Sequence, residues 1–279
     1  MKKILILLLI STFSGCSDDD NNNSNEIKVL EAQTLMNVSY GSDPQQLIDI
    51  YLPERKNDKT TKALFLLHGG GWSGGSKEDM NAAVAISKQL FPGYAIVNIG
   101  YRLSTYESPA YPKQIDDIKS VVAYIEKSNY SVSNDYAFLG VSAGGHLSML
   151  YAYGFDPEHR VKVVCNIVGP TDFNDPAYTE STLFFTDVIG YLTSDLTPQF
   201  LSEVSPITYA GAQSAPTIQF MGNVDPLVPV SQGQRLKAKL DGFNVANELH
   251  FYNAGHGNFG AADTQDIYEK LGIFFSAHF

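Results

Sequence analysis

Apolar and polar positions follow two periods along most of the chain. Short continuous apolar runs, such as 63–67, are typical of strands buried on both faces of a parallel sheet. Between such runs, apolar residues recur every three or four positions, as Ile115, Ile118 and Val122 do within 112–128. This alternation predicts an α/β fold, with a mostly parallel sheet and helices on both of its faces. The predicted strands span 47–53 (antiparallel), 63–67, 94–99, 136–139, 161–168, 217–221 and 247–252, and the predicted helices span 80–90, 112–128, 143–153, 231–240 and 264–275.

One internal segment, 171–209, departs from this alternation. It is rich in Phe, Tyr, Thr and Asp, and it has prolines at positions 176, 198 and 206 but little periodicity. We interpret it as a small cap of short helices inserted between core units. Because ligands of open α/β sheets bind beyond the carboxyl ends of the strands, we expect the functional site at that edge.

The N-terminal residues resemble a targeting segment. Lys2 and Lys3 precede an apolar run, 4–10, that is too short to span a bilayer. The small residues directly before Cys16 resemble the lipobox of bacterial lipoproteins. That resemblance implies that 1–15 is a signal peptide and that Cys16 becomes the lipidated first residue. An ordinary secretory signal with an incidental cysteine is the alternative.

Residues 16–26 are expected to form a disordered acidic tether. Residues 17–25 are all Ser, Asp or Asn, so they offer no apolar surface to bury. The tether is also similar to the acidic export tag of surface lipoproteins in the Bacteroidetes. The two resemblances together imply a protein that is lipid-anchored to the bacterial outer membrane, on its outer face. Residues 27–279 have a length that suits one large α/β domain.

Net charge, cysteine content and motif content limit the ligands and disulfide bonds that the chain is expected to have. A net charge of −11 argues against a nucleic-acid partner. If Cys16 is lipidated, Cys165 has no disulfide partner, and its apolar strand predicts a buried core residue. The histidines and cysteines are scattered, with no zinc-type spacing, and the chain has no P-loop motif. We therefore expect no metal and no other cofactor.

The pattern G-x-S-x-G occurs twice, at 71–75 and at 140–144. About one chain of this length in ten would contain it by chance, so its context must decide. Ser73 is followed by polar, turn-like residues. Ser142 lies between a predicted strand and a predicted helix, where a sharp turn can expose the hydroxyl. Ser142 is therefore the candidate nucleophile, and Ser73 is interpreted as a loop residue.

A serine hydroxyl is a poor nucleophile and needs an adjacent base, for which histidine has a suitable pKa. His256 lies in a glycine-flanked loop directly after the strand 247–252. His68, at the end of another strand, is the main rival by position. His146 lies one helical turn beyond Ser142 and is expected to point away from it.

The third member should be a carboxylate that orients the imidazole. Asp225 follows the strand 217–221 and precedes His256, which gives the chain order Ser–Asp–His. Asp172, after the strand ending near 168, is the alternative, and we favour Asp225.

Taken together, these motifs resemble a known superfamily. The sequence HGGGW at 68–72, the motif at 140–144, and Asp225 and His256 after the last two strands are similar to the α/β-hydrolases, and more narrowly to the HGGG-type esterases and lipases. The resemblance spans about residue 40 to the C-terminus. It implies the α/β-hydrolase fold and a carboxylic ester hydrolase with a Ser-His-Asp triad, in which His68 supports the glycine loop.

The same resemblance assigns the oxyanion hole. Backbone N–H groups must point at one spot near the nucleophile, and consecutive glycines let the chain turn them inward. By match to the family, Gly70 and Gly71 donate together with the N–H of Ala143. Trp72 adjoins this loop and is expected to wall the substrate pocket.

The substrate class follows from a narrower resemblance. Segments 49–53 and 101–103 are similar to a subgroup that includes bacterial carbohydrate deacetylases, feruloyl esterases and arylformamidases. It implies short acyl or feruloyl esters of carbohydrates as substrates. An amidase or arylformamidase, and an inactive binding protein on the same fold, remain alternatives. Arg102 either contacts substrate or, as we favour, pairs with Asp116 or Asp117.

Overall fold

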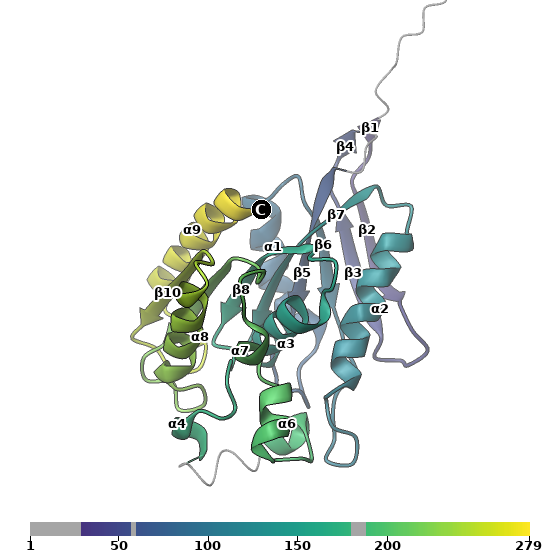
Figure 1. Cartoon of the computed structure of the whole chain (residues 1–279). Helices are drawn as coiled ribbons and strands as arrows, with labels where there is room; N and C mark the ends of the chain where they lie inside the picture. Colours follow the sequence, from purple (N-terminus) through teal and green to yellow (C-terminus); the bar gives the residue numbers. More distant parts are fainter. Residues whose placement is uncertain (1–28, 57–59, 180–187) are drawn as a thin grey trace, which may run out of the picture.

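The computed structural model describes residues 29–56, 60–179 and 188–279, which are built around an eight-stranded sheet (Figure 1). The strand order is β10-β9-β8-β7-β5-β6-β3-β2. The six strands from β10 to β6 are parallel, and β3 and β2 are antiparallel at one edge. The strands are β2 (Gln33–Ser39), β3 (Leu47–Leu52), β5 (Thr61–Leu67), β6 (Ala95–Ile99), β7 (Val132–Val141), β8 (Val161–Ile167), β9 (Thr217–Gly222) and β10 (Asn247–Tyr252), with a separate antiparallel pair of β1 (Val29–Leu30) and β4 (Arg55–Lys56).

Helices cover both faces of the sheet, as the alternation predicts. Side chains of α2, α3 and α8 pack on the face that includes Phe65 and Leu67 of β5, and side chains of α1 and α9 pack on the opposite face, which includes Leu64 and Leu66. The central strand is therefore buried on both sides, which explains its continuous apolar sequence. The helices are α1 (Asn81–Leu90), α2 (Lys113–Lys127), α3 (Ala143–Leu150), α4 (Pro176–Thr179), α6 (Pro198–Glu203), α7 (Pro206–Tyr209), α8 (Val230–Gly242) and α9 (Ala261–His278), with a 3₁₀ turn η1 (Lys77–Met80) and a π-helical turn η2 (Tyr151–Phe155).

The mostly parallel sheet with helices on both faces is confirmed, although several elements differ from the predictions, among them the short strands β1 and β4, which were not predicted. Strand β2 was not predicted, because it is an edge strand whose residues are largely exposed and carry no clear alternation. The helix expected over 143–153 ends as α3 at Leu150 and continues as the π-helical turn η2. Cys165 is fully buried in β8, as predicted, and is a free thiol.

The segment predicted as a cap, 171–209, contains α4, a helical stretch at 188–192, α6 and α7. In Figure 1, α4 and α6 lie at the end of the molecule opposite the β1–β4 pair. Residues 180–187 of this segment lie outside the described residues, as do the predicted signal peptide 1–15, the tether 16–26 and the lipidation site Cys16.

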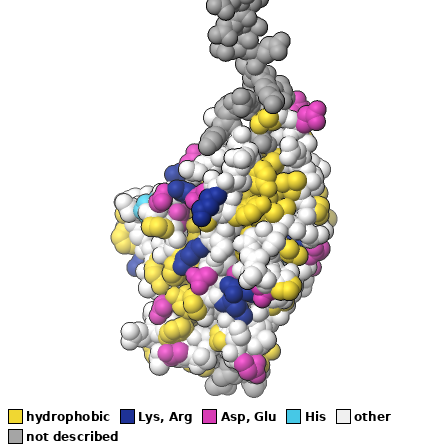
Figure 2. Space-filling view, turned by 90° about the vertical axis from the view of Figure 1, so that its right-hand side faces the viewer, with side chains coloured by type: hydrophobic (Ala, Val, Ile, Leu, Met, Phe, Trp, Pro, Cys, Tyr) yellow, Lys and Arg dark blue, Asp and Glu magenta, His cyan; other side chains and the backbone are white. Residues whose placement is uncertain are grey.

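The surface on the β2 side of the molecule carries both signs of charge. Figure 2 shows acidic and basic side chains interspersed on this face, beside areas of hydrophobic side chains. Within the described ranges, no helix is both long enough and apolar enough to cross a membrane.

Candidate active site

Ser142 occupies the sharp turn between β7 and α3. Its backbone has φ 54° and ψ −120°, a conformation that is strained for a residue with a side chain. The flanking glycines allow the close approach that this turn requires. A Cβ on Gly140 would lie 2.1 Å from the carbonyl oxygen of Gly144, and a Cβ on Gly144 would lie 2.2 Å from that of Leu67. The turn thus projects the Ser142 side chain beyond the carboxyl end of β7.

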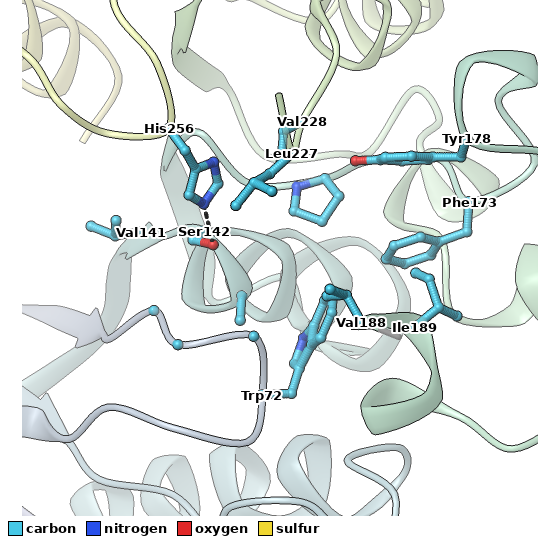
Figure 3. Close-up of a pocket in the computed structure, with 15 residues that line it drawn as sticks. Trp72, Val141, Ser142, Phe173, Tyr178, Val188, Ile189, Leu227, Val228 and His256 are labelled. Carbon is cyan, nitrogen blue, oxygen red and sulfur yellow. Dashed lines mark hydrogen bonds between the residues drawn. The ribbon is translucent and has the colours of Figure 1, made fainter. Parts of the chain in front are cut away.

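Three of the residues singled out in the sequence meet at this point. His256 Nε2 lies 2.8 Å from Ser142 Oγ, and His256 Nδ1 lies 2.8 Å from Asp225 Oδ2 (Figure 3 draws the contact with Ser142). Because the carboxylate can only accept, Nδ1 carries the proton, and Nε2 is left to accept from the serine hydroxyl. The side chain of Asp225 is inaccessible to solvent, whereas that of His256 is 21% exposed.

Backbone donors hold the Asp225 carboxylate in place. Its other oxygen, Oδ1, accepts hydrogen bonds from the N–H groups of Leu227 (2.8 Å) and Val228 (3.0 Å). Asp172, the alternative acid, instead forms an ion pair with Arg235 at 2.5 Å. The carboxylate that reaches His256 is therefore that of Asp225.

The glycine loop after β5 turns with positive φ at Gly70 (115°) and Gly71 (56°). Its turn is closed by hydrogen bonds from the N–H groups of Ser73 and Gly74 to the carbonyl oxygen of Gly70. Within the described ranges, no acceptor is bonded to the N–H groups of Gly70, Gly71 and Ala143. These three donors are consequently available to a ligand.

His68 lies beneath this loop and does not contact Ser142. Its ring stacks on Tyr101 with the ring centroids 4.0 Å apart, and its Nδ1 lies 2.7 Å from the carbonyl oxygen of Gly69. Burial lowers the pKa of His68, so the ring is neutral near pH 7. The hydroxyl of Tyr101 donates to the carbonyl oxygen of His68 at 2.7 Å, which ties the loop to the strand end of β6.

Trp72 is held by both its backbone and its side chain. It has φ 62° and is only 3% exposed. Its carbonyl oxygen accepts from the N–H and hydroxyl of Ser104 (both 3.0 Å) and from Gln114 Nε2 (2.7 Å). Its indole N–H donates to His146 Nδ1 at 3.1 Å.

His146 is the residue whose role the sequence did not reveal. Its ring is fully buried and bonded at both nitrogens, to Trp72 and to the carbonyl oxygen of Val204. Its position one turn beyond Ser142 and the lone tryptophan in the glycine loop were the available signals. Neither signal indicates that the indole N–H of Trp72 donates to the His146 ring.

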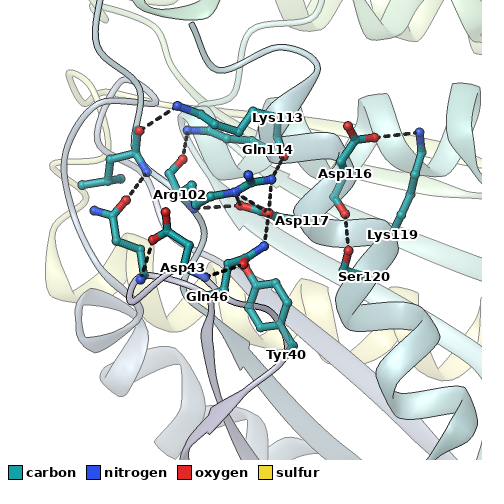
Figure 4. Close-up of polar contacts among 12 residues, drawn as sticks. Tyr40, Asp43, Gln46, Arg102, Lys113, Gln114, Asp116, Asp117, Lys119 and Ser120 are labelled. Atoms are coloured by element: carbon teal, nitrogen blue, oxygen red, sulfur yellow. Dashed lines mark hydrogen bonds and ion pairs between the residues drawn. The ribbon is translucent and has the colours of Figure 1, made fainter. Parts of the chain in front are cut away.

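Arg102 pairs with Asp117, one of the two partners predicted for it (Figure 4). Its guanidinium Nη2 lies 2.6 Å from Asp117 Oδ1, and its backbone N–H donates to Oδ2 at 2.8 Å. Arg102 Nε and Gln46 Nε2 also donate to the same carboxylate, each at 2.8 Å from Oδ1. The hydrogen bond to Asp117 raises the pKa of Arg102. Arg102 therefore fastens the loop after β6 to α2.

A cavity of about 410 Å³ opens beside Ser142 and His256 (Figure 3). Aromatic and aliphatic side chains form most of its wall, and among its described lining residues only His256 and Tyr178 have ionisable side chains. Burial, together with the charge of Asp225, raises the pKa of Tyr178, so its phenol remains protonated. The lining side chains come from the glycine loop, the turn at Ser142, the loop after β8, the 171–209 segment and the loop after β9. They include Trp72, Val141, Pro170, Phe173, Val188, Ile189, Leu227 and Val228.

Across residues 29–56, 60–179 and 188–279, no group of three His, Cys, Asp or Glu side chains is arranged to hold a metal ion. The chemistry available here is that of a serine, an imidazole and backbone N–H donors.

Comparison with solved structures identifies the fold class. A structure described as a truncated form of a carbohydrate esterase from gut microbiota superposes with a TM-score of 0.72 at 20% identity, over 87% of this chain and 97% of that chain. At this level of identity the match establishes the fold. The chain has the α/β-hydrolase fold.

Sequence comparison identifies the family. The BD-FAE family model matches residues 48–240, and the chain belongs to that family. It is 28% identical to Esterase LipC of Mycobacterium tuberculosis over 79% of this chain, although it spans only 59% of LipC. It is also 30% identical to a kynurenine formamidase of Danio rerio, over 65% of this chain and 64% of that protein.

Proposed function

We propose that this protein is a serine hydrolase that cleaves carboxylic esters through an acyl-enzyme. The observation that carries the proposal is the position of His256, 2.8 Å from both Ser142 and Asp225 at the edge of the apolar cavity. Membership of the BD-FAE family and similarity to an esterase agree with it.

The first half of the proposed reaction acylates Ser142. Its hydroxyl proton passes to His256 Nε2 as Oγ attacks the ester carbonyl carbon, and the carbonyl oxygen becomes an oxyanion. Asp225 stabilises the imidazolium formed in this step. The imidazolium then gives its proton to the leaving alkoxide oxygen, the C–O bond breaks, and the alcohol departs.

The second half returns the free enzyme. His256 takes a proton from water as the water oxygen attacks the acyl carbon. The resulting tetrahedral species expels Ser142 Oγ, which recovers its proton from the imidazolium. The carboxylic acid is released, and atoms and charge balance over the cycle.

Three backbone donors are proposed to stabilise both oxyanions. Among the residues that the structure describes, none accepts from the N–H groups of Gly70, Gly71 and Ala143. Ala143 also begins α3, whose N-terminal dipole favours negative charge. Removing one such donor typically lowers the rate by about 100- to 1000-fold.

The proposed substrates are short acyl or feruloyl esters of carbohydrates. An apolar cavity beside the nucleophile suits the acyl group of an ester, because its wall offers few hydrogen-bond partners. The carbohydrate portion of the proposal rests on the subgroup resemblance, with a carbohydrate esterase among the proteins that share the fold.

Two measurements test this function. Wild-type protein should hydrolyse 4-nitrophenyl acetate, and Ser142→Ala should abolish that hydrolysis. Acetylated xylan and feruloylated arabinoxylan should then be compared by chromatography of released acetate and ferulate. Equal rates for wild type and Ser142→Ala would contradict the assigned nucleophile.

An amidase acting on aryl formamides is the second candidate. The similarity to a kynurenine formamidase and the aromatic residues Trp72, Phe173 and Tyr178 around the cavity favour it. The discriminating measurement is kcat/KM on an aryl formamide against kcat/KM on an aryl acetate. An inactive binding protein would leave Ser142 unlabelled by a fluorophosphonate probe.

We also propose that the protein is anchored to the outer membrane through lipid on Cys16. The charged start, the short apolar run and the small residues before Cys16 support this. Cells expressing the full chain should incorporate labelled palmitate, and Cys16→Ser should not. Incorporation that is equal in the two would overturn the proposal.

A further inference from the structure

Three segments that are distant in sequence meet at the buried ring of His146. The ring belongs to α3, one turn beyond Ser142, and it is inaccessible to solvent. Trp72 of the glycine loop contacts it edge-on with ring centroids 5.3 Å apart, and Phe173 of the 171–209 segment does so at 5.2 Å. Its Nε2 lies 2.7 Å from the carbonyl oxygen of Val204, also in that segment.

The hydrogen bonds fix which tautomer His146 adopts. An indole N–H can only donate, so His146 Nδ1 must accept from Trp72. Nε2 therefore carries the hydrogen and donates to Val204. Burial lowers the pKa of His146 to about 4, so the neutral ring that these bonds require is the form present at neutral pH.

This arrangement settles the direction of the Trp72 side chain. The Trp72 backbone has a positive φ and its carbonyl oxygen has three donors, so the main chain is already fixed. What remains is the orientation of the indole, and its one polar atom is bonded to His146. Leaving a buried indole N–H without an acceptor is unfavourable, so the orientation bonded to His146 is strongly preferred.

We infer that His146 is a positioning residue, which holds the Trp72 indole as one wall of the cavity and thereby sets the preference for the acyl group. The inference rests on the ester hydrolase function proposed above. His146 does not line the cavity, whereas Trp72 does, with Phe173 across from it at a ring distance of 6.0 Å. A longer acyl chain contacts more of this wall than acetyl does, so its binding depends more strongly on the position of the indole.

Trp72 is the only tryptophan in the chain, which gives the inference a direct spectroscopic readout. A ¹H–¹⁵N spectrum of the full chain contains a single indole signal. In wild type we expect it to be shifted by the imidazole acceptor and protected from exchange with water. His146→Phe should move the signal and speed its exchange. His146→Gln should restore both, because a glutamine side chain can accept from Trp72 and donate to Val204.

Kinetics of the same variants test the effect on substrate preference. Each active concentration is fixed by fluorophosphonate titration, and kcat/KM is measured for 4-nitrophenyl acetate and 4-nitrophenyl butyrate. The butyrate has two more methylenes, so His146→Phe should lower its kcat/KM by roughly tenfold more than that of acetate, mainly through KM. The ratio of the two kcat/KM values, butyrate over acetate, measures the acyl preference. His146→Gln should keep this ratio within about twofold of the wild-type value.

Two further variants separate positioning from general damage. Ser148 is equally buried on α3 and donates to the carbonyl oxygen of Gly144, so Ser148→Ala perturbs the helix without touching Trp72, and it should leave the ratio unchanged. Adding His146→Phe to Trp72→Phe should produce no further change in the ratio, because His146 acts through the indole.

An unchanged ratio and an unchanged indole signal in folded His146→Phe would overturn the inference while leaving the proposed function intact. A further fall in the ratio when His146→Phe is added to Trp72→Phe would also overturn it. If wild-type protein hydrolyses neither ester, the proposed function fails and this inference fails with it, so the two failures are distinguishable.

Discussion

The same five-residue pattern, G-x-S-x-G, folds in two different ways in this chain. At 140–144 it makes the turn between β7 and α3, and its serine lies 2.8 Å from His256. At 71–75 it makes the end of the glycine loop before η1, and its serine only closes a turn through a backbone hydrogen bond to Gly70. A match to this pattern therefore does not by itself identify a catalytic serine.

The glycines of the two segments are required for different physical reasons. Gly140 and Gly144 lie where other backbone atoms approach too closely for any side chain. Gly71 has open space around its Cα, but its positive φ disfavours a residue with a side chain. Gly140 and Gly144 are thus constrained by packing between a strand and a helix, and Gly71 is constrained by its backbone conformation. Gly75 of the second segment is constrained by both, because its φ is 79° and its Cβ would lie 2.5 Å from the carbonyl oxygen of Gly69.

The sharpest way to test this comparison is to remove each serine. Ser142→Ala should lower kcat/KM on an aryl ester by roughly 10⁴-fold or more, because the nucleophile is lost. Ser73→Ala should stay within about threefold of wild type. The measurement is initial-rate hydrolysis of 4-nitrophenyl acetate, and a comparable loss in both variants would contradict the distinction between the two segments.

A substitution at Asp225 tests the role proposed for its carboxylate. Asp225→Asn should lower kcat by about 10⁴-fold, since the imidazole then loses the carboxylate that fixes its tautomer. Asp172→Asn offers a matched control, because Asp172 is also a buried carboxylate but pairs with Arg235. Its kcat should change little. The same ester assay measures both, and a larger effect at Asp172 would reverse the assignment.

Glycine substitutions compare the two kinds of constraint. Gly144→Ala should destabilise the fold by roughly 4 kcal/mol or more, because its Cβ would lie 2.2 Å from the carbonyl oxygen of Leu67 and 2.4 Å from that of His68. Gly71→Ala should cost only about 1–2 kcal/mol, the strain of a positive φ. Urea unfolding of the two variants measures the difference, and equal losses would show that packing does not distinguish these segments.

A further prediction concerns the contact between Trp72 of the 71–75 segment and His146, which follows the 140–144 segment on α3. The unfolded state protonates His146 near pH 6.5 and the folded state only near pH 4, so between these values the unfolded chain binds more protons. Stability should therefore fall as pH drops from 6.5 to 4, by roughly 3 kcal/mol from this residue. Burial of His68 acts in the same direction.

The matched variant for this prediction is His146→Gln, which keeps both hydrogen bonds but cannot titrate. Its free energy of unfolding, measured in urea from pH 7 to pH 4, should decline less steeply than that of wild type. Parallel pH curves for the two proteins would show that His146 is not responsible for the slope.

Much of the fold was predictable because its signals are local. A strand such as β5 is buried on both faces and is therefore apolar throughout, and the helices carry apolar residues at regular spacing. Strand β2 was missed because an exposed edge strand has no face that must be apolar. The positions of Ser142, Asp225 and His256 at strand ends were also predictable, since parallel strands bring their carboxyl ends to one edge.

The pocket wall was less predictable, because its contacts join segments with no fixed sequence spacing. The partnership of Trp72 with His146 depends on how the glycine loop turns over α3. The pairing of Arg102 with Asp117, which the sequence narrowed to two carboxylates, depends on which residue of α2 faces the loop after β6. Such contacts are decided by side-chain direction in the folded state rather than by local pattern.

The register between β5 and β7 has a consequence for how the protein reaches its active form. Leu67, the last residue of β5, pairs with Gly140, two residues before the nucleophile. The glycine loop and the serine turn therefore start level with each other on neighbouring strands, although α1, β6 and α2 separate them in the chain. Pairing of this long-range kind is slow to form. Recovery of hydrolytic activity during refolding should thus lag behind recovery of the helical circular-dichroism signal. Hydrolytic activity would then report when the sheet is complete.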